Sequence, residues 1–520
     1  MSRIVQAKAV EVHTKYPERI TSIIPKSKVL HVEGEVSTVL IHWGIDECRV
    51  LTNLGFKNIP SPMVRDYDWP GLYTPFRHQI KTASFLTLNH RAYVLNDMGT
   101  GKTSASAWAM DYLMKQGTVK RALIICPLSI INTAWRNDLF KTLMHRTVAI
   151  AYGTVDKRLK VIEQGADITI INFDGVQGRV LNALLKAKYD LFIIDEATAV
   201  KTVNTQRWKA INQLIPQDKR LWLMTGTPAA QSPVDAYGLV RLMHPHKVPR
   251  SQGGFKALVR YQVSQYQWLD RDNANEYVHS IMQPAIRYTK DECLDLPELL
   301  YASRDIPLTA QQDDYYKQLK KDMLIAIGKE TVSSVNAAVE INKLLQISSG
   351  AVYTESGNVV EFDVSTRYKE LNQIIKDSSH NTLVFCTFRH SIARLQAWLT
   401  KDGHIVDVIH GGVSLKDRSE IIDRFQSSGK RQVLLLQPQA ASHGITLHAA
   451  NTIVWWSPTT SYETYAQANA RVHRAGQVNA CTVIHLVSSG VEKRLYSALQ
   501  GRQNQQINLL ELYKAVITES

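Results

Sequence analysis

The chain has 520 residues, of which 44% are hydrophobic and 21% are charged, an ordinary balance for a globular protein with room for roughly three domains. Its formal net charge of +14 favours an anionic partner, nucleic acid first, although many enzymes are simply basic. Five scattered cysteines without a CxxC pair argue against a zinc site or a disulfide framework, and no apolar stretch is long enough to cross a membrane. We therefore expect a cytosolic protein.

The first half of the chain predicts an accessory segment followed by an α/β lobe. Residues 1–70 contain strand-like pieces such as "KVLHVEGEVSTVLIHW", and their nine Lys and Arg against eight Asp and Glu exclude a basic DNA-binding arm. Within residues 71–245, apolar runs alternate with helix-like stretches; the runs are "RAYVLND", "RALIICP", "TVAIAY", "ITIINF", "LFIID" and "LWLMTGT". Buried strands that alternate with helices predict a parallel sheet covered on both faces.

The second half predicts another lobe of the same kind. Residues 246–365 are long, polar and helix-like, so we expect an inserted helical subdomain. The alternating rhythm returns over residues 366–490 with "TLVFCTF", "HIVDVIH", "QVLLLQ", "NTIVWWS" and "CTVIHLV", and residues 491–520 predict a helix that braces this lobe. The expected fold class is α/β, with two parallel-sheet lobes, a helical insertion and a small β-rich N-terminal appendage.

A strand, a glycine-rich loop and a helix follow one another at "RAYVLNDMGTGKTSAS", which is the context that a phosphate-binding loop needs. Gly99 and Gly101 allow a tight backbone path, Lys102 is expected to reach the β- and γ-phosphates of ATP, and Thr103 is expected to bind Mg²⁺. Asn96 stands where the GxxxxGK[ST] pattern has its first glycine. The remaining loop residues predicted to contact the nucleotide are Asp97, Met98 and Thr100.

A pair of carboxylates follows the apolar run "YDLFIIDEAT". Because ligands of α/β proteins bind at the carboxyl ends of strands, Asp195 is predicted to hold Mg²⁺ and Glu196 to orient or deprotonate the attacking water. The alternative is a solvated acidic loop after a strand.

Two arginines in "YAQANARVHRAGQ" lie three residues apart. On one face of a helix, Arg471 and Arg474 could both point the same way, across a cleft to the γ-phosphate, which would make lobe closure depend on ATP. The alternative is a basic surface helix. Nearby, Trp455 and Trp456 could stack on bases, but aromatic residues after a strand are more often core.

The order of these motifs over residues 73–500 resembles the Snf2-like ATPases of helicase superfamily 2. The stretches that carry the resemblance are "TPFRHQ", "DMGTGKT", "IICPLSIINTAW", "DEAT", "LMTGTPAAQSPVDAYGLVRLM", "IRYTKDECLDLP", "LVFCTF", "QAASHGITLHAANTIVWW" and "QANARVHRAGQ". The form of the last two is similar to the annealing-helicase branch and to compact phage-encoded relatives. The resemblance implies two RecA-like lobes and a DNA-dependent ATP hydrolase.

The resemblance also implies roles for individual residues. Gln79 would bind adenine, while Gly444, Gln467, Arg471 and Arg474 would complete the ATP site from the second lobe. Thr225 and Thr227 would couple hydrolysis to lobe movement. These two threonines and a further set would line the DNA track, and that further set is Pro127, Ser129, Thr387, Ser442 and Thr446. The chain departs from the family pattern at Thr198, where histidine is usual, and at Ser442 and Thr446, where glycine and asparagine are frequent.

The main hypothesis is a monomeric DNA translocase in a bacterial or phage-infected cytosol, using ATP and Mg²⁺. It would remodel or anneal forked or branched duplex DNA with little sequence preference, beside replication or recombination proteins. One alternative is an ATP-gated DNA-binding subunit of a restriction or recombination complex, and another is an RNA helicase. The intact Glu196 and the paired arginines favour the translocase.

Overall fold

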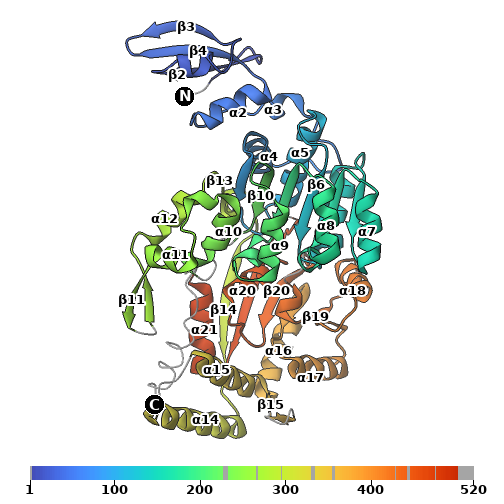
Figure 1. The fold of residues 1–520 in the computed structure, drawn as a ribbon. Helices are drawn as coiled ribbons and strands as arrows, with labels where there is room; N and C mark the ends of the chain where they lie inside the picture. Colours follow the sequence, from blue (N-terminus) through green and yellow to red (C-terminus); the bar gives the residue numbers. More distant parts are fainter. Residues whose placement is uncertain are drawn as a thin grey trace. The chain divides into compact units, whose positions relative to one another are not determined.

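The computed structural model describes residues 3–226, 232–264, 267–293, 296–329, 334–353, 358–427, 429–441, 445–474 and 476–501. The chain divides into two compact units, each with its own sheet (Figure 1). Unit 1 comprises Met1–Ala229 and Pro233–Cys293, and unit 2 comprises Ala230–Ser232 and Leu294–Ser520. Within the described ranges, no helix combines the length and the apolarity that crossing a bilayer requires.

The N-terminal part of unit 1 is a small antiparallel sheet, which confirms the β-rich appendage. Its strands, in spatial order, are β1 (Arg3–Val5), β2 (Ala9–Thr14), β4 (Val36–His42) and β3 (Lys28–Glu33). The accompanying helices are α1 (Glu18–Thr21), α2 (Ile45–Asn53) and α3 (Met63–Asp66). Alternate residues of β2 and β4, such as Val10, Val12 and Val39, are buried in one cluster with Leu51 of α2.

The main sheet of unit 1 is entirely parallel, as predicted. Its strands, in spatial order, are β13 (Ala285–Ile286), β5 (Arg91–Val94), β10 (Arg220–Met224), β9 (Leu191–Asp195), β6 (Ala122–Cys126), β8 (Ile168–Asn172) and β7 (Val148–Ala151). Neighbouring residues of one strand enter different core clusters: Ile193 packs in one and Ile194 in the other. The sheet is therefore covered on both faces.

Helices and short helical turns connect these strands. The α-helices are α4 (Arg77–Leu88), α5 (Lys102–Lys115), α6 (Asn137–Thr142), α7 (Val155–Glu163), α8 (Gly178–Lys186), α9 (Gln206–Leu214) and α10 (Ala236–Met243). The turns are η1 (Ile131–Arg136), η2 (Phe173–Gly175), η3 (Ala197–Val200), η4 (Pro233–Asp235) and η5 (Pro245–Lys247).

The segment 246–365 is not helical throughout, which corrects the sequence expectation. Its first part forms α11 (Gln252–Val259), β11 (Arg260–Ser264), β12 (Gln267–Asp270), α12 (Ala274–Ile281), β13 and α13 (Lys290–Cys293). A hairpin forms where Tyr261 and Val263 alternate with polar residues, because that period suits a strand and not a helix. The later strand β14 (Leu299–Asp305) belongs to the sheet of unit 2. The domain boundaries expected from the sequence stay predictions.

Unit 2 has its own parallel sheet, again as predicted. The strands, in spatial order, are β14, β21 (Cys481–Val487), β20 (Ala450–Trp455), β17 (Asn381–Phe385), β19 (Val433–Leu436) and β18 (Val406–Ile409), and β15 (Ala351–Tyr353) pairs with β16 (Val359–Glu361). The helices are α14 (Ala310–Lys329), α15 (Ser334–Ser349), α16 (Ser365–Asp377), α17 (Arg389–Lys401), α18 (Leu415–Ser427), α19 (Pro438–Ala441), α20 (Tyr462–Asn469) and α21 (Gly490–Gln500). Trp455 and Trp456 are fully buried, which confirms their assignment to the core.

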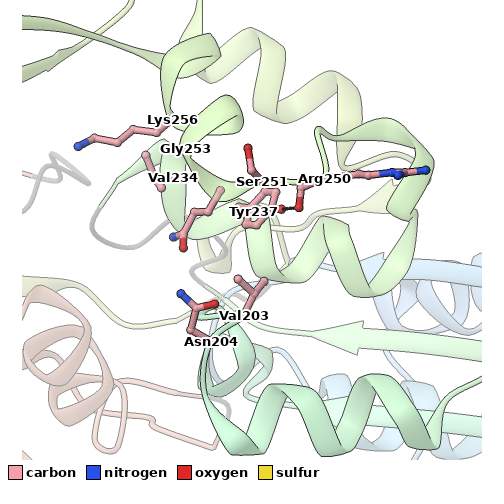
Figure 2. A pocket seen from close by; sticks show the side chains of 9 residues that line it. Val203, Asn204, Val234, Tyr237, Arg250, Ser251, Gly253 and Lys256 are labelled. Carbon is pink, nitrogen blue, oxygen red and sulfur yellow. Dashed lines mark hydrogen bonds between the residues drawn. The ribbon is translucent and has the colours of Figure 1, made fainter.

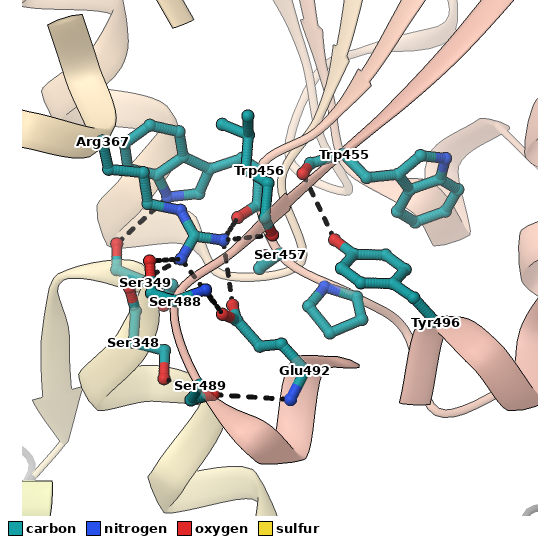
Figure 3. A network of polar contacts seen from close by, with 12 residues as sticks. Ser348, Ser349, Arg367, Trp455, Trp456, Ser457, Ser488, Ser489, Glu492 and Tyr496 are labelled. Atoms are coloured by element: carbon teal, nitrogen blue, oxygen red, sulfur yellow. Dashed lines mark hydrogen bonds and ion pairs between the residues drawn. The ribbon is translucent and has the colours of Figure 1, made fainter. Parts of the chain in front are cut away.

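A buried ion pair ties the elements of unit 2 together (Figure 3). Arg367 of α16 donates to both carboxylate oxygens of Glu492 on α21 and to the carbonyl of Trp456, and neither charged side chain is more than 2% exposed. Ser488 donates its backbone N–H to the same carboxylate. Both charges therefore have several partners, which recovers part of their desolvation cost, while the Nε atom of Arg367 has none among the described residues.

Candidate active site

The glycine-rich loop connects β5 to α5 with the geometry of a phosphate-binding loop. Gly99 and Gly101 have φ angles of 83° and 75°, in the left-handed region that favours glycine. Gly101 is also the residue that precedes the first turn of α5, so the N–H groups of that turn face the loop. Lys102 donates to the carbonyl oxygens of Asn96 (2.8 Å) and Asp97 (3.2 Å), which keeps its ammonium at the loop.

Asn96 explains why the first glycine of the pattern is dispensable. Its side chain is buried, donates to the hydroxyl of Thr82 on α4 (3.0 Å) and accepts the N–H of Tyr288 (3.0 Å). Asp97 adds two contacts to the same segment, because its N–H donates to the Tyr288 carbonyl and its carboxylate accepts the N–H of Lys290. An amide side chain at position 96 therefore fastens the loop to α4 and to residues 288–290.

Gln79 lies against the loop, where the resemblance places an adenine contact. A Cβ at position 101 would collide with the Gln79 amide nitrogen, so the side chain packs directly on Gly101. The amide oxygen accepts the N–H of Phe76 (2.9 Å), and the adenine contact of Gln79 stays a prediction. The preceding residue, His78, contacts the Thr100 carbonyl through Nε2 (2.7 Å).

A cavity of about 370 Å³ opens beside these residues. It is lined by aromatic and charged side chains, namely Phe76, Arg77, His78, Lys81, Tyr288, Glu292 and Cys293. The rings of Phe76 and His78 are stacked, with centroids 5.7 Å apart, and Phe76 is 49% exposed. A planar aromatic ligand finds both stacking surface and polar groups in such a cavity.

Asp195 is the last residue of β9 and Glu196 follows it, so the carboxylates stand at the carboxyl end of the strand, as expected. The Asp195 side chain is 6% exposed, and burial followed by the nearby Glu196 raises its pKa to about 7, against the lowering effect of Lys102. Glu196 has a φ of 51°, a conformation that non-glycine residues adopt rarely and that clusters at functional sites. The acidic pair is therefore not a solvated loop.

These carboxylates fit a divalent cation. Among the described residues, no group donates a hydrogen bond to the buried Oε2 atom of Glu196. Mg²⁺ is commonly held by one or two carboxylates together with phosphate oxygens and water, so a pair of carboxylates at this place is sufficient for it. Thr103, in the first turn of α5, is half-buried and is the hydroxyl predicted to join Asp195.

Sequence reasoning missed one residue of this site. Trp135 lies in η1, a π-helical turn, and its indole nitrogen donates to Oδ2 of Asp195 at 2.9 Å. Both side chains are buried. The stretch "INTAW" follows β6, the strand that neighbours β9, and this position was the available signal in the sequence. A single tryptophan in an apolar run, however, does not indicate a polar partner.

In unit 2, the helix that was expected to present the two arginines ends too early. Helix α20 stops at Asn469, so Arg471 and Arg474 lie in the turns that follow, and the prediction that they share a helix face is wrong. Arg471 is 9% exposed and donates to the Ala441 carbonyl at 2.8 Å, and Arg474 donates to the Ile445 carbonyl at 3.4 Å. The third expected residue, Gln467, is on α20, buried, and bonded to Glu463.

The residues expected on the DNA track differ in exposure. Pro127 and Ser129 are half-buried in the loop after β6, and Thr446 is half-buried in unit 2. Thr225 is 1% exposed, so it offers no surface to a phosphate backbone in this structure. Thr387 donates its hydroxyl to the carbonyls of Ser457 and Pro458. The other predicted residues, Thr227, Ser442 and Gly444, lie outside the described residues.

A second cavity in unit 1, of about 580 Å³, has no residue of the glycine-rich loop in its lining (Figure 2). It is lined by Val203, Asn204, Val234, Tyr237, Arg250, Ser251, Gln252, Gly253 and Lys256. Tyr237 donates to the Arg250 carbonyl at 2.8 Å, while the Arg250 guanidinium points away from the other side chains of the lining. No charged group converges on this cavity among the side chains drawn, so the loop remains the candidate site.

Comparison with known proteins decides the family. The model of the SNF2-related domain matches residues 78–351, more than half of the chain, and the model of the helicase conserved C-terminal domain matches residues 366–476. The chain belongs to the SNF2-related family. The two domains together point to an ATP-hydrolysing enzyme of the helicase type.

Relatives of this SNF2 chain are distant. Putative protein p41 of Acyrthosiphon pisum secondary endosymbiont phage 1 is 22% identical over 78% of the chain and 90% of its own length. The human DNA annealing helicase and endonuclease ZRANB3 is 25% identical over 81% of the chain, which spans 39% of that protein. The putative ATP-dependent helicase/translocase YwqA of Bacillus subtilis is 25% identical over 79% of the chain, which spans 46% of it.

Among solved structures, the Sulfolobus solfataricus SWI2/SNF2 ATPase core in complex with dsDNA is 22% identical, with a TM-score of 0.41. That similarity covers 87% of this SNF2 chain and 94% of the archaeal one.

Proposed function

We propose that this SNF2-family chain is a DNA-stimulated ATPase that translocates on duplex DNA and remodels or anneals forked or branched substrates. The observation that carries the proposal is the nucleotide loop of unit 1 together with the buried Asp195 and the half-buried Glu196, whose Oε2 atom has no donor among the described residues. A pure binding module needs the loop but has no use for a second carboxylate after the strand.

The residues of unit 1 divide the chemistry among them. Lys102 and the N–H groups at the start of α5 would bind the phosphates, and Gln79 with the neighbouring cavity would hold the base. Thr103 and Asp195 would hold Mg²⁺, which when bound neutralises charge on the β- and γ-phosphates. Glu196 would accept a proton from the attacking water, because it follows Asp195 directly in the chain and its Oε2 atom has no donor among the described residues.

The nucleic-acid part of the proposal is supported by charge. The net charge of +14 favours polyanions, and the relative ZRANB3 is a DNA annealing helicase by name. Phosphate contacts give affinity without sequence preference, so binding should weaken steeply with salt. A protein with 6–10 phosphate contacts loses roughly 10³–10⁵ in affinity between 50 and 200 mM salt.

The deciding experiment measures ATP hydrolysis by the full chain without nucleic acid and with single-stranded DNA, duplex DNA, forked DNA or duplex RNA. We expect duplex and forked DNA to stimulate hydrolysis most, and Lys102→Ala and Glu196→Gln to abolish it. Hydrolysis that is indifferent to every form of DNA would overturn the motor. Stimulation by RNA alone would establish the RNA-helicase alternative.

Glu196→Gln also separates the motor from an ATP-gated binding subunit. The variant should bind ATP and DNA at least as tightly as the wild type while it hydrolyses nothing, because only the proton acceptor is lost. If the wild type binds DNA in an ATP-dependent manner but turns over no faster than this variant, the gated-subunit alternative is correct. Strand separation, annealing and translocation are then distinguished with fluorescently labelled forks.

A further inference from the structure

The indole of Trp135 is placed against the carboxylate that the proposed function assigns to the metal. β6 and β9 are parallel neighbours, with Ile125 opposite Ile194, so the chain segments that follow them meet at one edge of the sheet. Trp135 lies in the segment that follows β6, and Asp195 is the last residue of β9. Their hydrogen bond of 2.9 Å joins residues that are 60 positions apart in the sequence. The ring itself is fully buried.

This bond fixes the orientation of the Asp195 carboxylate. One oxygen, Oδ1, accepts the N–H of Glu196 at 2.9 Å, and the other, Oδ2, accepts the indole N–H. With one donor on each oxygen, rotation of the carboxylate would break both bonds in a site that is 6% exposed. Groups that hydrogen-bond to a metal-binding carboxylate set its direction and basicity, and their loss typically costs 10- to 100-fold in metal affinity.

The turn that carries Trp135 also connects to the expected DNA track. Pro127 and Ser129 precede η1 by a few residues, and both are partly accessible. A π-helical turn departs from regular helix geometry, and such turns are frequent at functional sites. A shift of this turn on DNA binding would therefore change the position of the indole donor.

We propose that Trp135 is a positioning residue that links DNA contact at residues 127–129 to the metal-binding geometry of Asp195. The proposal rests on the proposed ATPase function. It predicts reciprocity: DNA raises the affinity for Mg²⁺ with nucleotide, and Mg²⁺ with nucleotide raises the affinity for DNA by the same factor.

The test compares Trp135→Phe with the matched control Trp108→Phe in the full chain. Trp108 is equally buried in the same core cluster, but its indole donates to the Pro70 carbonyl. The readout is binding of a fluorescent ADP analogue during titration with Mg²⁺, with and without duplex DNA, so that turnover is not involved. We expect Trp135→Phe to weaken the apparent Mg²⁺ affinity about 10- to 100-fold and to abolish its enhancement by DNA. Trp108→Phe should retain both.

Equal Mg²⁺ affinity and equal DNA enhancement in the two variants would overturn the inference. If the wild type binds no nucleotide and hydrolyses no ATP, the proposed function fails instead, so the two failures are distinguishable. Should Trp135→Phe not fold, indole ¹⁵N–¹H spectra of the wild type decide, with the Trp135 signal assigned by its change in Asp195→Asn. Movement of that signal on addition of Mg²⁺ with ADP and again with DNA supports the link, and an unmoved signal contradicts it.

Discussion

Ionisable residues are distributed very unequally between the two compact units. Unit 1 holds 38 Lys and Arg against 25 Asp and Glu, a net charge of +13, whereas unit 2 holds 23 against 22, a net charge of +1. The acidic groups differ too: among the described residues, Glu196 of unit 1 has a buried carboxylate oxygen without a donor, whereas Glu492 of unit 2 is paired with the buried guanidinium of Arg367. Unit 1 therefore carries nearly all of the net positive charge, while unit 2 is almost neutral, and the proposed role of its Arg471 and Arg474 at the γ-phosphate remains to be tested.

The largest expected effect tests whether Arg474 of unit 2 takes part in ATP hydrolysis. In Arg474→Ala, kcat should fall by about 10³–10⁵ if the arginine stabilises the γ-phosphate during transfer, while ATP binding to unit 1 changes little. ATPase rates and binding of a fluorescent ATP analogue measure the two quantities. The control is Arg431→Ala, since Arg431 likewise donates to backbone carbonyls of unit 2. Equal kcat values in the two variants would contradict a role of Arg474 in phosphate transfer.

The contribution of the buried Arg367–Glu492 ion pair to the stability of unit 2 is tested by Glu492→Gln. This change leaves the Arg367 charge buried without its counter-ion and should cost about 3–5 kcal/mol in the free energy of unfolding. Differential scanning calorimetry should show the loss in the transition of unit 2. Glu420→Gln, at an exposed pair with Lys416, should change stability by less than about 1 kcal/mol. Comparable losses in the two variants would contradict the buried role.

In unit 1, Asn96→Gly restores the usual glycine but deletes the contacts to Thr82 and Tyr288. We expect a loss of about 1–3 kcal/mol in stability, because a buried N–H and a hydroxyl lose their partners, and weaker nucleotide binding. Chemical denaturation and ADP-analogue titration measure these effects. Unchanged stability would mean that the Asn96 side chain does not help to hold the loop.

The smallest expected effect is a loss of folding stability at acidic pH. Burial lowers the pKa of His485 in unit 2 to about 4, and its Nε2 lies 2.9 Å from the Tyr465 hydroxyl. The unfolded chain protonates this ring below its ordinary pKa of 6.5 while the folded chain does not, so stability is lost as pH falls from 6.5 towards 4. The contribution is on the order of 1–3 kcal/mol. Unfolding of His485→Gln should depend less on pH over that range, and an unchanged slope would contradict the assignment.

The sequence predicted both parallel sheets because every buried strand is a short apolar run between helix-like stretches. The carboxylates and the glycine loop were equally local signals. Hydrogen bonds between residues far apart in the sequence could not be predicted in this way. Trp135 and Asp195 are 60 positions apart, and Arg367 and Glu492 are 125 positions apart. The arginine prediction failed for a different reason, since helical spacing alone does not show that α20 ends at Asn469.

The contacts of Asn96 have a consequence for the order in which the protein matures during synthesis. The loop leaves the ribosome early, but Tyr288, which donates to the Asn96 side chain, follows 192 residues later. Strand β13, which pairs with β5 beside the loop, is synthesised just before Tyr288. A nascent chain that stops short of residue 284 therefore contains the whole glycine loop and α4, but lacks β13 and the contacts of residues 288–290. Nucleotide binding is expected to emerge only after nearly 300 residues have been translated.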